Sequence, residues 1–295
     1  MFKAHQNSSR RGAVSFSCDG GVLGSKNLPS AAEPTASKIR AEALMHLLAL
    51  ILSVALSAPV DTPSLQQHPS RVDAGGFGHR EGEPPVYTQT FTEADARKAF
   101  TFSDPRVWSV KAAPKGGWLE HRPGQKYKTP QRSPHNIALL ADWTFEDFIL
   151  EAEFLQTGRE YGHRDQCVFF GFQDPTRFYY VHLSTKADAN AHNVFVVDRK
   201  PRRSFAKKTT KGIAWGRDAW HKVRIERSVS KGTIRVFFDD MKTPIMLADS
   251  KTHGRGWIGF GSFDDEGRVR NIKVWSKSAK RERTKAFSTD APTKK

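Results

Sequence analysis

Apolar and polar residues alternate along several segments of the chain, and this alternation constrains the fold more than any other feature. In residues 148–154 every second residue is apolar, and two glutamates stand between the apolar positions. The same period of two recurs in residues 223–226, 234–238 and 272–274. Since successive side chains of a strand point to opposite faces, each segment is predicted to be a strand with one buried face.

Two further segments, residues 168–172 and 194–197, are apolar on both faces and are predicted to be central strands. Clusters of Gly, Pro, Asp and Ser separate the strands. One short helix is predicted over residues 94–100, with Thr92 as its cap and Asp95 three residues later. Roughly a dozen strands with almost no helix predict an all-β fold, a two-sheet jelly-roll sandwich with disordered termini.

Residues 47–56 form an apolar run that ends in Ser57 and Ala58. A run of ~10 residues suits a signal-peptide core and is short for a transmembrane helix, which needs ~20 residues. We therefore expect cleavage near Ala58 and no stable transmembrane anchor; an uncleaved anchor is the alternative. Either translation begins at Met45, or the region before the apolar run is unusually long. Each reading places the rest of the chain outside the cytoplasm, secreted or in the periplasm or cell envelope.

Shifts in composition divide the chain into four expected parts. Residues 1–58 are the N-terminal extension and signal peptide, and residues 59–85 are a flexible linker rich in Pro, Gly, Ser and His. Residues 86–275 are the jelly-roll sandwich. Residues 276–295 are charged, and we predict that they form a basic, disordered tail with nothing to bury.

The chain of 295 residues carries a net charge of +16, which favours an acidic partner. Seven cations lie in residues 199–211 without one acid, and Arg202 and Arg203 are among them. We expect this basic segment to be exposed, mobile and able to bind a polyanion; a solubilising loop is the alternative. The export signal disfavours nucleic acid, so a sulfated or uronic polysaccharide fits better.

Cys18 lies before the apolar run and Cys167 begins a predicted central strand, so no disulfide framework is expected. We predict that Cys167 is a small buried hydrophobe rather than a reactive thiol. The sequence contains no His or Cys spacing typical of zinc and no phosphate-binding loop. No metal or other cofactor is predicted, and the acidic turn of residues 264–266 leaves calcium as the alternative.

Several motifs of the chain resemble those of concanavalin A-like secreted domains. They comprise an opening hairpin, a long strand, the hairpin that follows it and the closing strands. The matching segments are residues 108–110, 117–119, 145–154, 169–183, 220–225, 232–239, 256–259 and 271–274. The similarity spans most of residues 91–275 and is closest to laminin-G-like jelly rolls and to the 3-keto-disaccharide hydrolase-like family of secreted bacterial proteins. Residues 159–165 stand where that hydrolase family has a Gly-Asn-Ser-Gly turn.

Polar residues suited to a sugar ligand gather around the predicted hairpin of residues 169–183. The loop before it is rich in charged and aromatic groups, and Tyr180 and His182 share one face of its second strand. Sugars require flat aromatic rings and forked hydrogen-bond donors or acceptors. The predicted binding residues are His163, Arg164, Asp165, Tyr180, His182, His192, Arg202 and Arg203. The alternative is a solvated loop with satisfied strand histidines.

Glu151 and Glu153 are the candidate catalytic acids. Their spacing of two puts both carboxylates on one face of a strand, with ~6.5–7 Å between the Cα atoms, within reach of acid and nucleophile roles. The usual glucanase pattern has a third acid, which is missing here because Phe154, Leu155 and Gln156 follow. A solvent-facing side of a strand is the alternative, and whether the chain is an enzyme stays open.

The sequence therefore predicts an exported β-sandwich that binds a carbohydrate. A glycoside hydrolase of the 3-keto-disaccharide hydrolase-like type and a structural envelope protein are the alternatives. A hydrolase requires carboxylates or histidines that converge in one cleft, whereas an envelope protein requires no cleft.

Overall fold

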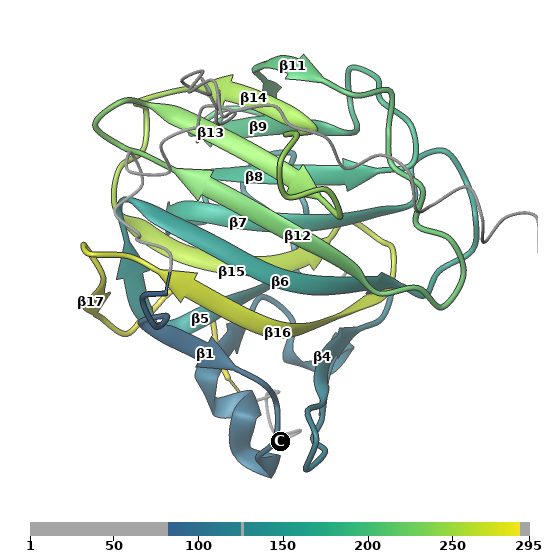
Figure 1. The fold of residues 1–295 in the computed structure, drawn as a ribbon, viewed down its shortest axis with the longest axis vertical. Coiled ribbons are helices and arrows are strands. Elements are labelled where there is room, and N and C mark those ends of the chain that lie inside the picture. Colours follow the sequence, from purple (N-terminus) through teal and green to yellow (C-terminus); the bar gives the residue numbers. More distant parts are fainter. Residues whose placement is uncertain (1–81, 125–126, 290–295) are drawn as a thin grey trace, which may run out of the picture. The chain divides into compact units, whose positions relative to one another are not determined.

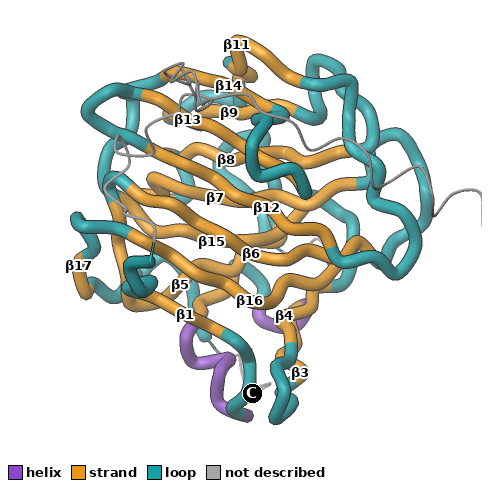
Figure 2. Tube along the Cα trace, viewed as in Figure 1, coloured by secondary structure: helices purple, strands orange, loops and turns teal. Residues whose placement is uncertain are grey.

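A computed structural model of the chain describes residues 82–124 and 127–289. In these residues the strands form two antiparallel sheets that stack face to face (Figure 1). Strands and loops make up nearly all of the described chain (Figure 2). The predicted all-β, two-sheet sandwich is confirmed.

The strand order places segments that are far apart in sequence next to one another. The nine-stranded sheet has the order β11 (Ala206–Thr209), β14 (Met246–Asp249), β13 (Thr233–Phe238), β12 (His221–Arg227), β6 (Phe148–Gln156), β16 (Gly267–Trp275), β4 (Trp118–His121) and β3 (Trp108–Lys111), and β1 (Tyr87–Gln89) pairs with β16. The eight-stranded sheet has the order β10 (Arg203–Ser204), β9 (Asn193–Asp198), β8 (Arg177–Ser184), β7 (Asp165–Asp174), β15 (Gly256–Ser262), β5 (Asn136–Phe145) and β17 (Lys280–Arg281), and β2 (Phe100–Phe102) pairs with β5.

The main hydrophobic core lies between the two sheets. It contains Leu150 of β6 and Val223 of β12 on one side and Val168 of β7 on the other. A second cluster lies on the outer face of the eight-stranded sheet and includes Phe169 and Phe178. Strands β7 and β9, which are apolar on both faces, are therefore covered on both sides. This is the environment that the sequence predicted for them.

Strand β16 contains a β-bulge that keeps its apolar face toward the core. Val269 and Ile272 both belong to the main core, although an unbroken period of two would put them on opposite faces. The register shifts between Arg270 and Lys273, and Asn271 has a φ of 51°. The extra residue at the bulge restores the inward direction of the later side chains.

Two short 3₁₀ helices occur in the described residues, η2 (Ala94–Ala99) and η3 (Pro105–Val107). Helix η2 confirms the predicted short helix, whereas the single turn of η3 was not predicted. The cap differs from the expectation, because Glu93 and not Thr92 occupies the N-cap position and makes no side-chain cap hydrogen bond. Buried Ala96 instead fixes the helix against the core.

The C-terminal segment corrects a prediction. Residues 276–289 were expected to be disordered, but Lys280 and Arg281 form β17 on the edge strand β5. The indole Nε1 of Trp257 donates to the carbonyl oxygen of Glu282 at 3.0 Å, and the Phe287 ring lies 5.8 Å from that of Phe172. The segment thus covers part of the outer face of the eight-stranded sheet. The composition of the segment did not predict this role, because its charged residues are typical of a disordered tail. One phenylalanine and several backbone hydrogen bonds are enough to hold the segment on the sheet.

The predicted N-terminal extension, signal peptide and most of the linker, residues 1–81, lie outside the described residues, as do residues 290–295. In the part of the chain that is described, no helix has both the length and the apolar character needed to cross a membrane.

Ending the chain after Trp275 is expected to lower the free energy of unfolding by about 3 kcal/mol, because the cover of the outer face is lost. In a domain of this size such a loss lowers the melting temperature by about 6–12 °C. Chemical and thermal denaturation measure the change. A chain that ends after Thr289 keeps every contact described above and is the matched control. Equal midpoints for both truncated chains would contradict a stabilising role for residues 276–289.

Candidate functional site

A cavity of about 310 Å³ opens at one end of the outer face of the eight-stranded sheet. Its walls come from five loops and from the ends of β7 and β8. The lining residues are Arg132, Tyr161, His163, Asp165, His182, Asn190, Arg202, Phe263 and Asp264. The structure therefore brings together four of the predicted binding residues, His163, Asp165, His182 and Arg202.

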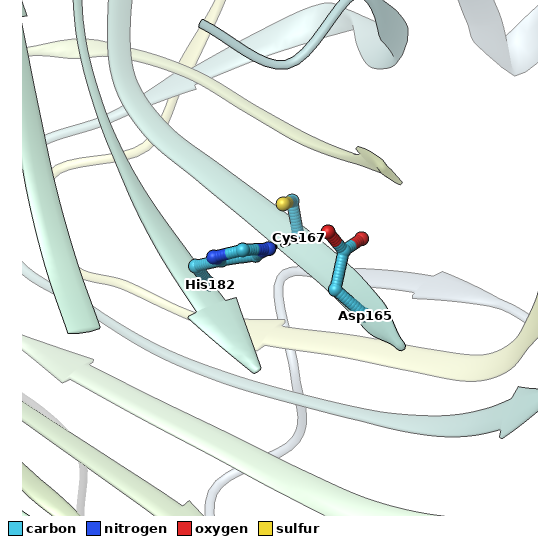
Figure 3. A group of neighbouring side chains, drawn as sticks. All are labelled: Asp165, Cys167 and His182. Atoms are coloured by element: carbon cyan, nitrogen blue, oxygen red, sulfur yellow. Dashed lines mark hydrogen bonds and ion pairs between the residues drawn. The ribbon is translucent and has the colours of Figure 1, made fainter. Parts of the chain in front are cut away.

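The floor of the cavity follows from the register of β7 and β8. Asp165 and Cys167 are two residues apart on β7 and share a face, and His182 of β8 is the cross-strand partner of Cys167. Figure 3 shows these three side chains gathered on neighbouring strands. His182 Nε2 and a carboxylate oxygen of Asp165 form a short hydrogen bond. The other carboxylate oxygen of Asp165 accepts a hydrogen bond of 2.6 Å from the Ser262 hydroxyl.

A second carboxyl group, that of Asp265, lies behind the floor. It accepts hydrogen bonds from the Tyr161 hydroxyl at 2.7 Å and from the backbone amide of Asp165 at 2.9 Å. Burial raises the pKa of Asp265 to about 6, and the nearby charge of Asp165 acts in the same direction. The acid that faces the cavity is its neighbour Asp264. The turn of residues 264–266 thus divides its acids between a buried network and the cavity wall.

Arg202 is held rigidly in the cavity wall. Its guanidinium carbon lies 4.8 Å from the centre of the Phe195 ring and 4.5 Å from that of Phe263. Nη1 donates to the Tyr180 hydroxyl at 2.8 Å, and Nη2 donates to the Asn190 side-chain oxygen at 3.4 Å. In the described part of the chain Arg202 makes no salt bridge, so its partners are neutral. Arg202 also lines the cavity.

Arg132 contributes a second cation to the same wall. Its backbone oxygen accepts from the amide of Arg202 at 3.2 Å, which ties the two loops together. No salt bridge to Arg132 occurs among residues 82–124 and 127–289. A third feature of the wall is the pair of His163 and Asp188, whose Nε2 and carboxylate oxygen lie 2.5 Å apart.

Four other predicted binding residues lie elsewhere. Tyr180 is fully buried beneath Arg202, and its ring stacks on Phe195 with centroids 5.0 Å apart. Arg164 points away from the cavity and donates to the backbone oxygens of Gln156 and Gly216. Buried His192 bonds to the Thr210 hydroxyl at 2.9 Å, and Arg203 lines a separate cavity of about 260 Å³.

The two candidate catalytic acids lie on the outer face of the nine-stranded sheet, away from this cavity. Glu151 pairs with Arg224 and with Lys222, and Glu153 pairs with Arg270 at 2.7 Å. Burial acts to raise the pKa of Glu151, but the hydrogen bonds and charges of Lys222 and Arg224 outweigh it and hold that pKa below its ordinary value. An ionised carboxylate of this kind suits a structural ion pair better than a proton donor.

The basic segment of residues 199–211 is more ordered than the sequence predicted. It contains β10 and β11, and β11 pairs with β14. Lys207 forms an ion pair with Asp249, and Arg199 lies 3.2 Å from Asp198. Most of its cations remain exposed, whereas Arg202 turns inward. The segment was expected to be mobile because it contains no acid, but acids from other strands neutralise part of its charge.

Sequence reasoning did not place Arg132, Asn190, Ser262 and Phe263 in the site, and it considered Asp264 only as part of an acidic turn that could hold calcium. They come from loops distant in sequence, and a run of Ser, Phe and two Asp after a predicted strand was the one available signal. Cys167 was predicted to be buried, and this is confirmed. Burial raises the pKa of its thiol well above the ordinary value, so the free thiol stays protonated.

No model of a protein family matches the chain, and no curated protein sequence matches it. The membership in the 3-keto-disaccharide hydrolase-like family that the motifs suggested therefore stays a prediction.

Solved structures with a similar course of the chain include two from Bacillus subtilis. One is the carbohydrate-binding module CBM66, with 13% identity, coverage of 60% of this chain and 96% of that chain, and a TM-score of 0.44. The other is a protein of unknown function with a galectin-like fold, with 14% identity, coverage of 68% and 98%, and a TM-score of 0.45. Likenesses of this extent carry no information about the ligand of this chain.

Replacing Glu151 by Gln is expected to lower the free energy of unfolding by about 1 kcal/mol, because Lys222 and Arg224 lose a shared partner. Binding in the cavity should not change, since Glu151 lies on the other sheet. Urea denaturation and a binding titration test the two statements. A ~100-fold loss of turnover on any glycan, the scale of a removed general acid, would show instead that Glu151 is catalytic.

Buried His192 predicts a loss of stability in acid. Burial lowers the pKa of His192 from 6.5 to about 4, and the charge of His182 adds to the effect. Between these values the unfolded chain binds the proton and the folded chain does not, so stability falls as the pH drops from about 6.5 to about 4. The full contribution is about 3 kcal/mol. His192→Gln should flatten the pH dependence of the denaturation midpoint over this range, and an unaltered slope would refute the assignment.

Proposed function

We propose that this domain binds a glycan in the cavity at the end of β7 and β8, and that the sugar residue in the cavity carries an acidic group. The observation that carries the proposal is Arg202, whose guanidinium is clamped between Phe195 and Phe263 and has neutral partners only. A second guanidinium, that of Arg132, lines the same wall.

The size and chemistry of the cavity support a sugar ligand. At about 310 Å³ it lies at the lower end of the volumes that bind small molecules, which suits one or two sugar rings. Asn190 and Asp264 offer forked donors and acceptors for hydroxyl groups, and Phe263 offers an apolar edge. The cavity walls stand on a two-sheet frame, so a ligand meets groups that are already in position.

The two arginines favour an acidic sugar over a neutral one. A guanidinium binds a carboxylate or sulfate through parallel charge-assisted hydrogen bonds, which are about twice as strong as neutral ones. Because neither Arg132 nor Arg202 has an acidic partner in the described part of the chain, an anionic group on the ligand would complete the pairing. The exposed cations of the basic segment would add a weaker attraction that depends on salt.

Glycoside hydrolysis is the second candidate, because two carboxyl groups, those of Asp165 and Asp264, line the same cavity. A glycoside hydrolase requires such a pair. However, both oxygens of Asp165 already accept hydrogen bonds, from Ser262 and from His182. Binding is therefore the function that the geometry favours. A structural role without a ligand leaves the two arginines and the cavity unexplained.

An array of uronic, sulfated and neutral polysaccharides, read together with an assay for released sugars, tests the proposal. Arg202→Met is expected to weaken binding to the acidic ligand about 10–100-fold. This is the loss in affinity that corresponds to removing one hydrogen bond to a charged group. Arg203→Met is the matched control, because Arg203 belongs to the same basic segment but lines the other cavity. Equal weakening by both changes would mean that the segment acts by its overall charge and that the cavity is not the site. Released sugar that disappears in Asp264→Asn would establish hydrolysis instead.

A further inference from the structure

Three side chains of three different chemical kinds converge beneath the cavity. The carboxylate of Asp165, the thiol of Cys167 and the imidazole of His182 each have a ligand atom within 4.8 Å of the others. In the described part of the chain this is the one group of His, Cys, Asp and Glu that lies close enough to hold an ion. We propose that Asp165, Cys167 and His182 bind a zinc ion. The proposal does not depend on what the cavity binds.

The fold positions the three groups before any ion arrives. Asp165 and Cys167 share one face of β7 because they are two residues apart, and the antiparallel register places His182 directly across from Cys167. Ser262 at the end of β15 donates to one oxygen of Asp165. That bond orients the carboxylate and leaves its other oxygen directed at His182, which is how outer hydrogen bonds commonly fix a metal ligand.

The nature of the ligands selects the ion. Thiolate sulfur and imidazole nitrogen are ligands of zinc and other borderline-soft ions, whereas calcium and magnesium take oxygen ligands. A doubly charged ion with one thiolate and one carboxylate gives a site with no net charge. This matters because the three residues are almost completely buried, with exposed fractions of 3%, 0% and 3%. Burial of an unbalanced charge would be costly.

The proton balance is simple. On binding, the Cys167 thiol releases its proton to the solvent and its sulfur binds the ion. The Nε2 proton of His182, which is hydrogen-bonded to Asp165 before the ion arrives, is lost to the solvent, and Nδ1 takes up a proton from the solvent. The imidazole stays neutral, and Nε2 binds the ion through its lone pair. The ion replaces the hydrogen bond between His182 and Asp165, so both groups remain paired. Zinc binding should therefore weaken as the pH falls.

The site is open on one side only. Asp165 and His182 line the cavity, whereas Cys167 belongs to the second hydrophobic cluster with Phe169. Three protein ligands leave a fourth position of a tetrahedral ion, and this position faces the cavity. Zinc sites with three protein ligands hold water or a ligand oxygen there, whereas purely structural sites are closed by a fourth side chain.

Cobalt titration of the full-length, reduced and EDTA-treated protein tests the proposal. The chain has two cysteines, so the Cys18→Ser variant keeps Cys167 as its sole thiol. One equivalent of Co²⁺ should give that variant a thiolate-to-cobalt absorption band, and Zn²⁺ should abolish the band by displacement. Cys167→Ser should lose the band. His182→Gln should weaken binding by at least ~10-fold, and His192→Gln, which changes a buried histidine outside the cluster, should leave binding unchanged.

Stability gives a second measurement. Zn²⁺ at ~100 times its dissociation constant should raise the melting temperature of the wild-type protein by about 5–10 °C, and EDTA should reverse the rise. The Cys18→Ser protein decides the matter even if Cys167→Ser does not fold. The absence of a cobalt band in Cys18→Ser would overturn the proposal. So would a band that persists in Cys167→Ser, since the ion would then be bound elsewhere.

Discussion

Strands β7, β8 and β9 must be buried on both faces, and the rest of the domain depends on this requirement. One face packs against the nine-stranded sheet in the main core. The other carries Phe169, Phe178 and Phe195, and burying each such side chain stabilises the fold by about 1.5–3 kcal/mol. The C-terminal segment of residues 276–289 supplies part of the cover through Ala286 and Phe287, and Tyr127 packs against Phe287. At the ends of β7 and β8 the outer face carries Asp165 and His182 in place of apolar side chains. The cavity opens at these two residues.

The same apolar face also builds the cavity wall. Phe195 belongs to the second cluster and at the same time supports the guanidinium of Arg202. The polar network below is equally fixed, since Ser262 connects the carboxylate of Asp165 to the backbone amide of Asp265. The groups of the cavity wall and floor are therefore held by partners that are themselves packed. Because these side chains are already ordered, ligand binding costs little additional conformational entropy.

The strands were predictable because the alternation of apolar and polar residues can be recognised within each short segment. His163, Asp165 and His182 were predictable as neighbours because they lie at or beside the ends of the two strands of one hairpin. The adjacent Arg164 shows the limit, since one step along the chain reverses the direction of a side chain. Tyr180 was expected to face a ligand, but Arg202 covers it. Arg132 and Phe263 line the cavity because two loops that are far apart in the sequence meet there. No pattern within either loop indicates that meeting. The order of residues 276–289 likewise rests on pairing with the distant strand β5.

The strand order has a consequence for how the chain reaches its native state. In each sheet a central strand comes from near the end of the chain: β15 lies between β7 and β5, and β16 lies between β6 and β4. Until those strands are made, each sheet exists only as two unjoined halves with open edges, which invite pairing with other chains. Contacts between residues so far apart in sequence form slowly. The domain must therefore assemble as one late, cooperative unit rather than strand by strand as synthesis proceeds.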